Sequence, residues 1–243
     1  GSNVQIWRPM DGSASAAHAA PDAIVESYAG NQQPGLQPAT YTEAAGFTTV
    51  ELGLAARESA FVVFRNNGQQ LAPAPSPTRH TVMMIRGPWT VAFPPHLGAP
   101  ETIRLDKPDF WTRSSNLGVK FFSGTATYST SFTVTSSVLH GKHLILHLGD
   151  VRDIAQIRIN GKSTGITWAP PYDVDVTGTL HPGSNKVEIR VTNEWTNRIL
   201  GDSSLPANHR ILPGVPPTRF GPPPALPDSG LSGDVALLSD ATR

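Results

Sequence analysis

An Asn-Gly pair between two runs of alternating apolar residues is the feature that most constrains how this chain folds. The pair is Asn160-Gly161, and an Asn-Gly dipeptide in this setting is the strongest short-range signal of a β-hairpin, because both residues tolerate the positive φ of a type I′ turn. The preceding run predicts a strand from Gln156 to Asn160, and the second arm leads to Trp168 and Tyr172. The sequence therefore predicts antiparallel β structure around residue 160.

The residues after this hairpin keep the same pattern. A short strand is predicted at Tyr172 to Val176, a turn at His181-Pro182-Gly183, and a long strand from Lys186 to Thr192. Side chains alternate along the long strand, with Val187, Ile189 and Val191 on one face and Glu188, Arg190 and Thr192 on the other. Such alternation is typical of an antiparallel strand with one buried and one solvated face.

Short strands separated by turns are predicted over the rest of residues 80–240. The chain has 22 glycines and 23 prolines, which suit turns between short strands better than helices. Further strands are predicted at Thr81–Ile85, Trp89–Phe93, Thr102–Leu105, Gly124–Val134, His143–Leu148 and Asp234–Leu238. About eight or nine strands in one domain favour an all-β fold, a jelly-roll β-sandwich.

The residues before this sandwich divide into a small β region and a linker. Strands are predicted at Val4–Trp7, Thr48–Leu54 and Ser59–Arg65, which are too few for a complete sandwich. Residues 1–66 are therefore interpreted as a small partial β domain, which either docks on the sandwich or is the end of a preceding domain. Residues 67–79 are rich in proline and alanine, a composition that favours an extended, semi-rigid linker.

Charge and cysteine content exclude several classes of partner. Lysine plus arginine equals aspartate plus glutamate at 19 each, so no basic field is present to bind nucleic acid or an anionic membrane. No apolar run approaches the roughly 18 residues of a membrane helix. The chain has no cysteine, which excludes disulfides and thiolate metal sites.

Several runs in the predicted sandwich resemble known domains. GTATYSTSFTV (124–134), LHLGDVRDIAQIRINGKSTG (146–165) and DVTGTLHPGSNKVEIRVTN (175–193) are similar to the sugar-binding jelly roll of family 2 glycoside hydrolases, which has the galactose-binding-like fold. A longer combination, WAPPYDVDVTGTLHPG (168–183), VTNEWTNRILGD (191–202) and DSGLSGDVAL (228–237), resembles the C-terminal part of family 106 α-L-rhamnosidases. The resemblance implies an accessory region of a large carbohydrate-active enzyme.

This resemblance implies two functions from different classes. The favoured one is a non-catalytic carbohydrate-binding module that targets a polysaccharide-degrading glycoside hydrolase to its substrate. The alternative is a structural accessory domain that braces the catalytic barrel of an α-L-rhamnosidase and has no sugar affinity; an independent hydrolase or lyase is a third. The expected partners are a polysaccharide or oligosaccharide and the catalytic domain of the parent enzyme. The expected location is secreted or periplasmic; the opening Gly1-Ser2 is typical of a cloning scar, so a native signal peptide would not be visible in this sequence.

A sugar site needs particular side chains. Pyranose rings stack on flat aromatics, and their hydroxyls pair with planar amides, carboxylates and guanidinium groups. Seven such residues gather near the predicted strand ends: Trp168, Tyr172, Asn193, Trp195, Asn197, Arg198 and Asp202. Residues 195–202 lose the period of two and are predicted as a loop. The alternative is that these side chains pack and pair within the protein, as Arg198 with Asp202. Trp7, Trp89 and Trp111 are predicted to plug a core or a domain interface.

Two pairs of carboxylates are candidates for catalytic groups. Asp173 and Asp175 share one face of a strand, and Asp150 and Asp153 bracket a turn. Glycoside hydrolysis uses such a pair across a cleft. Aspartates in these places more often accept hydrogen bonds from local backbone amides, so no catalytic residue is predicted.

A metal site finds little support among the histidines. His143 and His147 have the spacing of a helical metal pair, but the residues between them read as a strand, on which the two rings begin some 13 Å apart. They are predicted to be surface or cross-strand histidines. Galactose-binding-like domains often carry a structural calcium ion on loop oxygens, so calcium is the one cofactor that the resemblance suggests.

Overall fold

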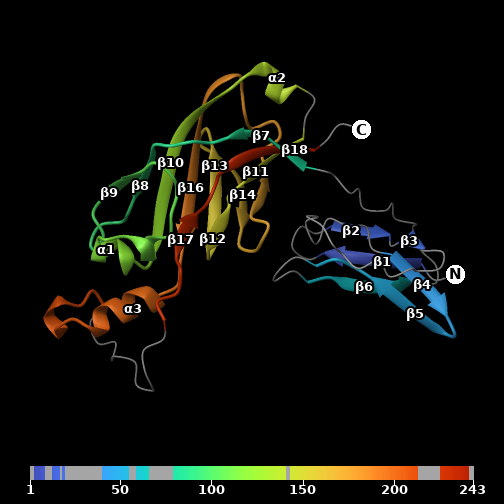
Figure 1. Ribbon diagram of the computed structural model, residues 1–243, viewed down its shortest axis with the longest axis horizontal. Coiled ribbons are helices and arrows are strands. Elements are labelled where there is room, and N and C mark those ends of the chain that lie inside the picture. Colours follow the sequence, from blue (N-terminus) through green and yellow to red (C-terminus); the bar gives the residue numbers. More distant parts are fainter. Residues whose placement is uncertain are drawn as a thin grey trace. The chain divides into compact units, whose positions relative to one another are not determined.

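The computed structural model describes residues 3–8, 13–16, 18–19, 40–54, 59–65, 79–140, 143–212 and 225–240 (Figure 1). Contacts between residues divide the chain into two compact units, Gly1–Thr78 and Arg79–Arg243. The predicted linker at residues 67–79 lies outside the described residues, apart from Arg79.

The first unit contains two three-stranded sheets. One has the order β2 (Ser13–Ala16), β1 (Asn3–Arg8), β6 (Phe61–Arg65), and the other has the order β3 (His18–Ala19), β4 (Thr40–Ala44), β5 (Phe47–Glu51). The strands pair antiparallel except for β3 and β4, which are parallel. Val4 and Ile6 of β1 are buried against Tyr41 and Val50 of the second sheet. The two sheets therefore share a small core, which apolar residues of β1 provide.

The second unit is built from three antiparallel sheets. The largest has six strands in the order β14 (Lys162–Thr167), β13 (Ile154–Ile159), β16 (Gly183–Thr192), β10 (Thr125–Val134), β8 (Trp89–Ala92), β9 (Thr102–Leu105). A four-stranded sheet has the order β15 (Asp173–Asp175), β11 (Leu144–His147), β18 (Ala236–Asp240), β7 (Arg79–Met84), and a two-stranded sheet joins β12 (Asp150–Arg152) to β17 (Gly230–Ser232). Neighbours such as β7 and β18 come from opposite ends of this unit. The predicted all-β class with antiparallel sheets is confirmed.

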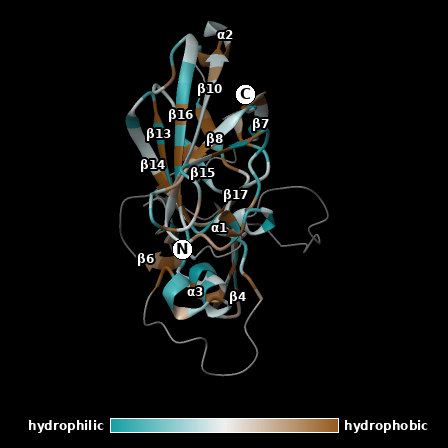
Figure 2. Ribbon diagram, turned by 90° about the vertical axis from the view of Figure 1, so that its left-hand side faces the viewer, coloured by the Kyte–Doolittle hydropathy of each residue, from teal (hydrophilic) through white to brown (hydrophobic). Residues whose placement is uncertain are grey.

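The core of this unit forms from the inward faces of the sheets. Val187, Ile189 and Val191 of β16 are fully buried, as their alternation predicts. Hydropathy changes repeatedly along the strands of the six-stranded sheet in Figure 2, because successive side chains point to opposite faces. Trp111, which is 1% exposed, stacks on Tyr128 with ring centroids 6.3 Å apart, and Trp89 is fully buried. Both tryptophans are core residues, whereas Trp7 of the first unit is 38% exposed.

In the part of the chain that the structure describes, helices occupy only short connections. They are η1 (Trp111–Arg113), α1 (Leu117–Lys120), α2 (Ser136–Leu139), α3 (Thr196–Ser203) and η2 (Ala207–His209). The loop predicted at residues 195–202 is wrong, because α3 covers nearly all of it. The inward face of α3 consists of Asn197, Arg198, Gly201 and Asp202, whose spacing is helical. This face is polar, so it lacks the apolar stripe by which a helix is recognised in a sequence.

Candidate functional site

Trp168 extends an exposed apolar edge of the six-stranded sheet. Its indole is 52% exposed and follows Thr167 at the end of β14, whose side chain is buried. Strand alternation therefore directs Trp168 to the same outer face as Ile166, which is 61% exposed. Because Thr167 pairs with Ala155, the neighbouring residue opposite Trp168 is Ile154, which is also exposed. A flat aromatic ring in this position is accessible to a ligand.

Trp195 lies at the same end of the six-stranded sheet. The register pairs Ile154 of β13 with Thr192 of β16, and Trp195 follows three residues after Thr192. Trp195 occupies the N-cap position of α3, where its carbonyl accepts a hydrogen bond from the Ile199 amide at 3.0 Å. Its side chain is 54% exposed. The fold thus brings the two exposed tryptophans of the predicted site to one end of the sheet.

The polar residues predicted beside Trp195 form a buried network on the inward face of α3. Asn197 donates to the Pro227 carbonyl at 3.0 Å and to Ser229 Oγ at 3.2 Å. Arg198 Nη2 lies 3.0 Å from Asp202 Oδ1, and the two side chains are only 6% and 5% exposed. Asp202 Oδ2 accepts hydrogen bonds from two backbone amides of residues 211 and 212, at 3.1 and 2.8 Å. These groups attach α3 to the sandwich.

Asn193 and Tyr172 have structural contacts of their own. Asn193 accepts from the Gly124 amide and donates to the Phe122 carbonyl, both at 2.9 Å, which joins the end of β16 to the start of β10. Tyr172 is 4% exposed and packs in the main core. Its φ of 58° is strained for a bulky residue, and hydrogen bonds of its backbone amide and carbonyl hold this conformation.

Five of the seven predicted residues therefore have structural contacts within the protein, whereas the two tryptophans are exposed. Direct sugar contact requires accessible atoms, which the side chains of Tyr172, Asn197, Arg198 and Asp202 do not have. The amide of Asn193 is used within the protein. The structure agrees with the alternative prediction, in which Arg198 pairs with Asp202 within the protein. These five residues hold the segments from which Trp168 and Trp195 project.

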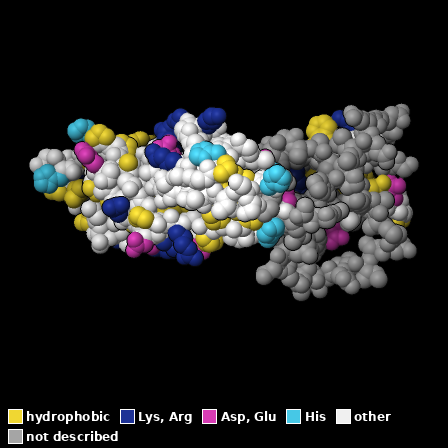
Figure 3. All heavy atoms as spheres, turned by 90° about the horizontal axis from the view of Figure 1, so that it is seen from above, with side chains coloured by type: hydrophobic (Ala, Val, Ile, Leu, Met, Phe, Trp, Pro, Cys, Tyr) yellow, Lys and Arg dark blue, Asp and Glu magenta, His cyan; other side chains and the backbone are white. Residues whose placement is uncertain are grey.

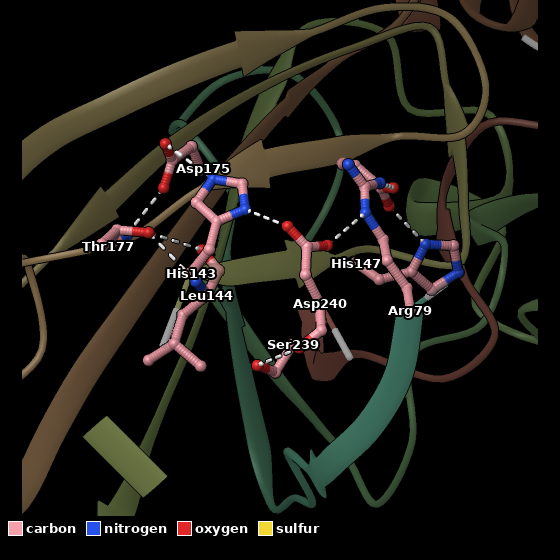
Figure 4. Close-up of polar contacts among 9 residues, drawn as sticks. Arg79, His143, Leu144, His147, Asp175, Thr177, Ser239 and Asp240 are labelled. Carbon is pink, nitrogen blue, oxygen red and sulfur yellow. Dashed lines mark hydrogen bonds and ion pairs between the residues drawn. The ribbon is translucent and has the colours of Figure 1, made fainter. Parts of the chain in front are cut away.

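A polar cluster on the outer face of the four-stranded sheet was only partly visible in the sequence. This histidine–aspartate cluster consists of Arg79, His143, His147, Asp173, Asp175 and Asp240. Figure 4 shows the His143 ring between two carboxylates, and the distances are 2.6 Å from Nδ1 to Asp240 and 3.3 Å from Nε2 to Asp175. The cluster thus links β15 to β18 across β11, as cross-strand histidines do.

The second half of the cluster connects the two edge strands of the same sheet. His147 Nδ1 lies 2.7 Å from Asp173 Oδ1, and Arg79 donates to Asp173 at 2.6 Å and to Asp240 at 3.3 Å. Arg79 belongs to β7 and Asp173 to β15, so one guanidinium joins the first and the last strand of the sheet. Spacing in the sequence carried no sign of this pair, because the partners are 94 residues apart.

The electrostatics of the cluster favour a structural role. The hydrogen bond to Asp240 raises the pKa of His143 above its ordinary value; partial burial opposes this effect, and Asp175 adds to it. For Asp175, burial opposes ionisation, but hydrogen bonds from Thr177 and His143 outweigh it and lower the pKa. A general acid in glycoside hydrolysis needs the opposite, a carboxyl group with a raised pKa. The geometry therefore supports bracing of the sheet.

The other candidate carboxylates behave similarly. Asp150 pairs with Arg152, whose guanidinium also donates to the Tyr172 hydroxyl at 3.3 Å. Within the residues that the structure describes, no group of three or more His, Asp or Glu side chains is arranged to hold a metal ion. None of the helices in this described part is long and apolar enough to span a membrane.

A pocket of about 270 Å³ lies near β8 and β9, at the edge of the six-stranded sheet opposite β14. Its walls come from the β7–β8 connection, the segment after β9, and the β17–β18 connection. The ion pair between Lys107 and Asp234, at 2.8 Å, joins two of these walls. No pattern in the sequence indicates this pocket, because its walls come from three separate parts of the chain.

Comparison with known proteins shows that part of the second unit matches a known domain type. Residues 105–212 match the family described as glycosyl hydrolase 2 galactose-binding domain-like. A stretch of 125 residues is 42% identical to a protein of Formosa agariphila named "Putative beta-glucuronidase" and covers 51% of this chain and 11% of that protein. The galactose-binding-like fold predicted from the sequence is confirmed by the family match.

A solved rhamnosidase structure extends the similarity to both units. A rhamnosidase from Novosphingobium sp. PP1Y matches with a TM-score of 0.70 and 32% identity, over 99% of this chain and 21% of that chain. A β-glucuronidase from Ruminococcus gnavus matches with a TM-score of 0.47 and 20% identity, over 66% of this chain and 28% of the β-glucuronidase chain. The present chain thus spans about a fifth of the rhamnosidase and about a tenth of the curated relative.

Proposed function

We propose that this chain is a non-catalytic carbohydrate-binding module of a large polysaccharide-degrading glycoside hydrolase, because residues 105–212 form a galactose-binding-like domain of the glycosyl hydrolase 2 type. The similarity to a rhamnosidase over both units supports a parent enzyme of that kind. The finer assignment, a C-terminal accessory region of a family 106 α-L-rhamnosidase, is part of this proposal. Its setting is secreted or periplasmic, where polysaccharides are degraded.

The observation that carries the proposal is the pair of exposed tryptophans at one end of the six-stranded sheet. Trp168 and Trp195 are both more than half exposed, whereas Trp89 and Trp111 are buried in the core. An exposed indole keeps apolar surface in contact with water, which is unfavourable, and it adds nothing to the packing of the core. A sugar ring that stacks on the indole removes this surface from water. In this proposal Trp168 and Trp195 contact the sugar, and the other five predicted residues keep the supporting segments in place.

The second candidate is a structural domain that braces the catalytic barrel of an α-L-rhamnosidase. It is favoured by the apolar edge formed by Ile154, Ile166 and Trp168, which are 47%, 61% and 52% exposed. Such adjacent exposed side chains also suit burial against another domain. The two candidates differ in one measurable property, because a bracing domain has no affinity for sugar by itself.

Affinity electrophoresis and calorimetry against a panel of polysaccharides test the proposal on the full chain. We expect Trp168→Ala and Trp195→Ala each to weaken binding by roughly tenfold, because loss of an aromatic stacking contact costs about 1–1.5 kcal/mol. Leu117→Ala is the matched control, since Leu117 is 67% exposed on α1 and takes no part in the proposed site. Binding that neither tryptophan variant changes would contradict the proposed site, and absence of binding would favour the bracing domain.

A further inference from the structure

We propose that the outer face of the six-stranded sheet is a platform that binds an extended polysaccharide bearing uronate carboxylates. This inference rests on the proposed carbohydrate-binding function, and it specifies the chemical class of the sugar. The platform consists of two rows of side chains that cross all six strands, together with Ile154 and Trp168 at one edge.

The register of the sheet places these rows on one face. The first row contains, in spatial order, Ile166, Gln156, Arg190, Thr127, Ala92 and Thr102. The second row contains Ser163, Arg158, Glu188, Ser129, Thr90 and Arg104. Each row spans five strand spacings, or roughly 24 Å, which is long enough for several sugar units.

Hydroxyl groups of β10 lie at the centre of the platform, beside Arg190 and Glu188 of β16. Along β10, residues 125, 127, 129, 131 and 133 are all threonine or serine, and these positions alternate with the buried core residues of that strand. Thr125 and Thr192 bond to each other at 2.7 Å, while Thr127 and Ser129 are partly exposed. A row of hydroxyls offers both donors and acceptors to the hydroxyls of a glycan.

Three arginines give this face a positive charge within a chain of zero net charge. Arg104, Arg158 and Arg190 are exposed, and among the described residues none of them has a carboxylate partner. The acidic residue in the two rows, Glu188, pairs with Lys186 at 2.7 Å. A guanidinium group matches a carboxylate by two parallel hydrogen bonds, so unpaired arginines among hydroxyls suit a uronate better than a neutral sugar.

The remaining contacts of these arginines leave donors available. Arg158 Nε and Nη2 donate to the Gly161 carbonyl, at 3.2 and 2.7 Å, which holds the side chain at the hairpin end of the sheet. Arg190 Nη1 makes one long bond of 3.3 Å to Gln156. Each guanidinium carries five N–H groups, so both retain donors for a ligand.

Other occupants fit this face less well. A protein interface has an apolar centre and a polar rim, whereas here the apolar residues lie at one edge and hydroxyls occupy the centre. Nucleic acid requires many cationic contacts, whereas the two rows contain three arginines and no lysine. In the part of the surface that Figure 3 shows, lysine and arginine side chains are likewise scattered among other residues. The combination of hydroxyls, three arginines and one tryptophan at the edge favours an acidic glycan.

The experiment measures binding of the full chain to polygalacturonate and to the same polymer after its carboxylates have been reduced to alcohols. We expect at least roughly tenfold tighter binding to the acidic polymer, and the difference should shrink in high salt. Arg104→Gln and Arg190→Gln should each weaken binding to the acidic polymer severalfold and leave binding to the reduced polymer unchanged. Arg86→Gln is the matched control, because Arg86 is exposed but lies outside the platform.

The outcomes separate this inference from the proposed function. Equal binding of both polymers, or arginine variants with unchanged affinity, would overturn the platform while leaving sugar binding intact. Polyglutamate that binds as tightly as polygalacturonate would also overturn it, because the face would then recognise charge alone. If neither polymer nor any neutral glycan binds, the carbohydrate-binding function itself fails. Trp168→Ala should weaken binding to both galacturonan polymers, since stacking does not depend on the carboxylate.

Discussion

Removal of the Asp202 charge should strongly destabilise the segment that carries Trp195. In Asp202→Asn, the side chain keeps its shape, but the Arg198 guanidinium remains 6% exposed without its counter-charge. Breaking a buried ion pair by removing one partner costs about 3–5 kcal/mol. With a urea m-value of about 2–3 kcal/mol/M for a unit of this size, the unfolding midpoint should fall by roughly 1–2.5 M.

The assay is urea unfolding of the full chain, with hydrogen exchange of the Ile199 amide as a local probe. That amide bonds to the Trp195 carbonyl in the first turn of α3, and an eight-residue helix has little stability of its own. Asp234→Asn is the control, because it breaks an ion pair with both side chains about 60% exposed, for which we expect at most about 1 kcal/mol. If Asp202→Asn lowers stability no more than this control, the buried pair does not support α3.

Three further predictions concern the backbone, the charge cluster and its pH dependence. Gly230→Ala should lower the free energy of unfolding by about 2–4 kcal/mol, because φ is +97° and a Cβ would lie 2.8 Å from the Trp111 ring. The control Gly161→Ala, at φ +81° with no atom within 4 Å, should lower it by only about 1 kcal/mol in the same urea titration. Asp173→Asn should lower the melting temperature more than the control Asp234→Asn, because the side chain of Asp173 is 9% exposed and pairs with Arg79. Since the pKa of His143 is raised in the folded protein, its contribution is present in full below the ordinary histidine value and is lost as pH rises through the raised one. The melting temperatures of the native chain and His143→Gln should therefore differ at pH 5, below the ordinary histidine pKa, and converge as the pH rises through the raised pKa of His143. A difference independent of pH would contradict the assigned protonation.

Local patterns in the sequence predicted most of the strands, because alternation depends on neighbouring residues alone, but they missed five short ones: β2, β3, β4, β12 and β17. The long strand β16 and the hairpin at Asn160-Gly161 are found where the sequence predicts them. Helix α3 was missed, since its buried face is polar and its reason for burial is remote: the Arg198 amide donates to Ser123, 75 residues earlier in the chain. The seven predicted site residues likewise include both exposed tryptophans and buried or internally bonded residues, because the sequence does not show which distant segments cover a side chain.

The all-β class, the alternating faces of the strands and the type of domain follow from local patterns along the chain. Which polar residues face water depends on how distant segments pack. Arg198 and Asp202 lie on the buried face of α3, whereas Trp168, just after β14, and Trp195, at the N-cap of α3, are exposed. The tertiary structure also assembled the six side chains of the histidine–aspartate cluster and the rows of the platform from strands far apart in the chain. The physical reason is that strand formation is a local preference, whereas burial depends on which distant segments pack together.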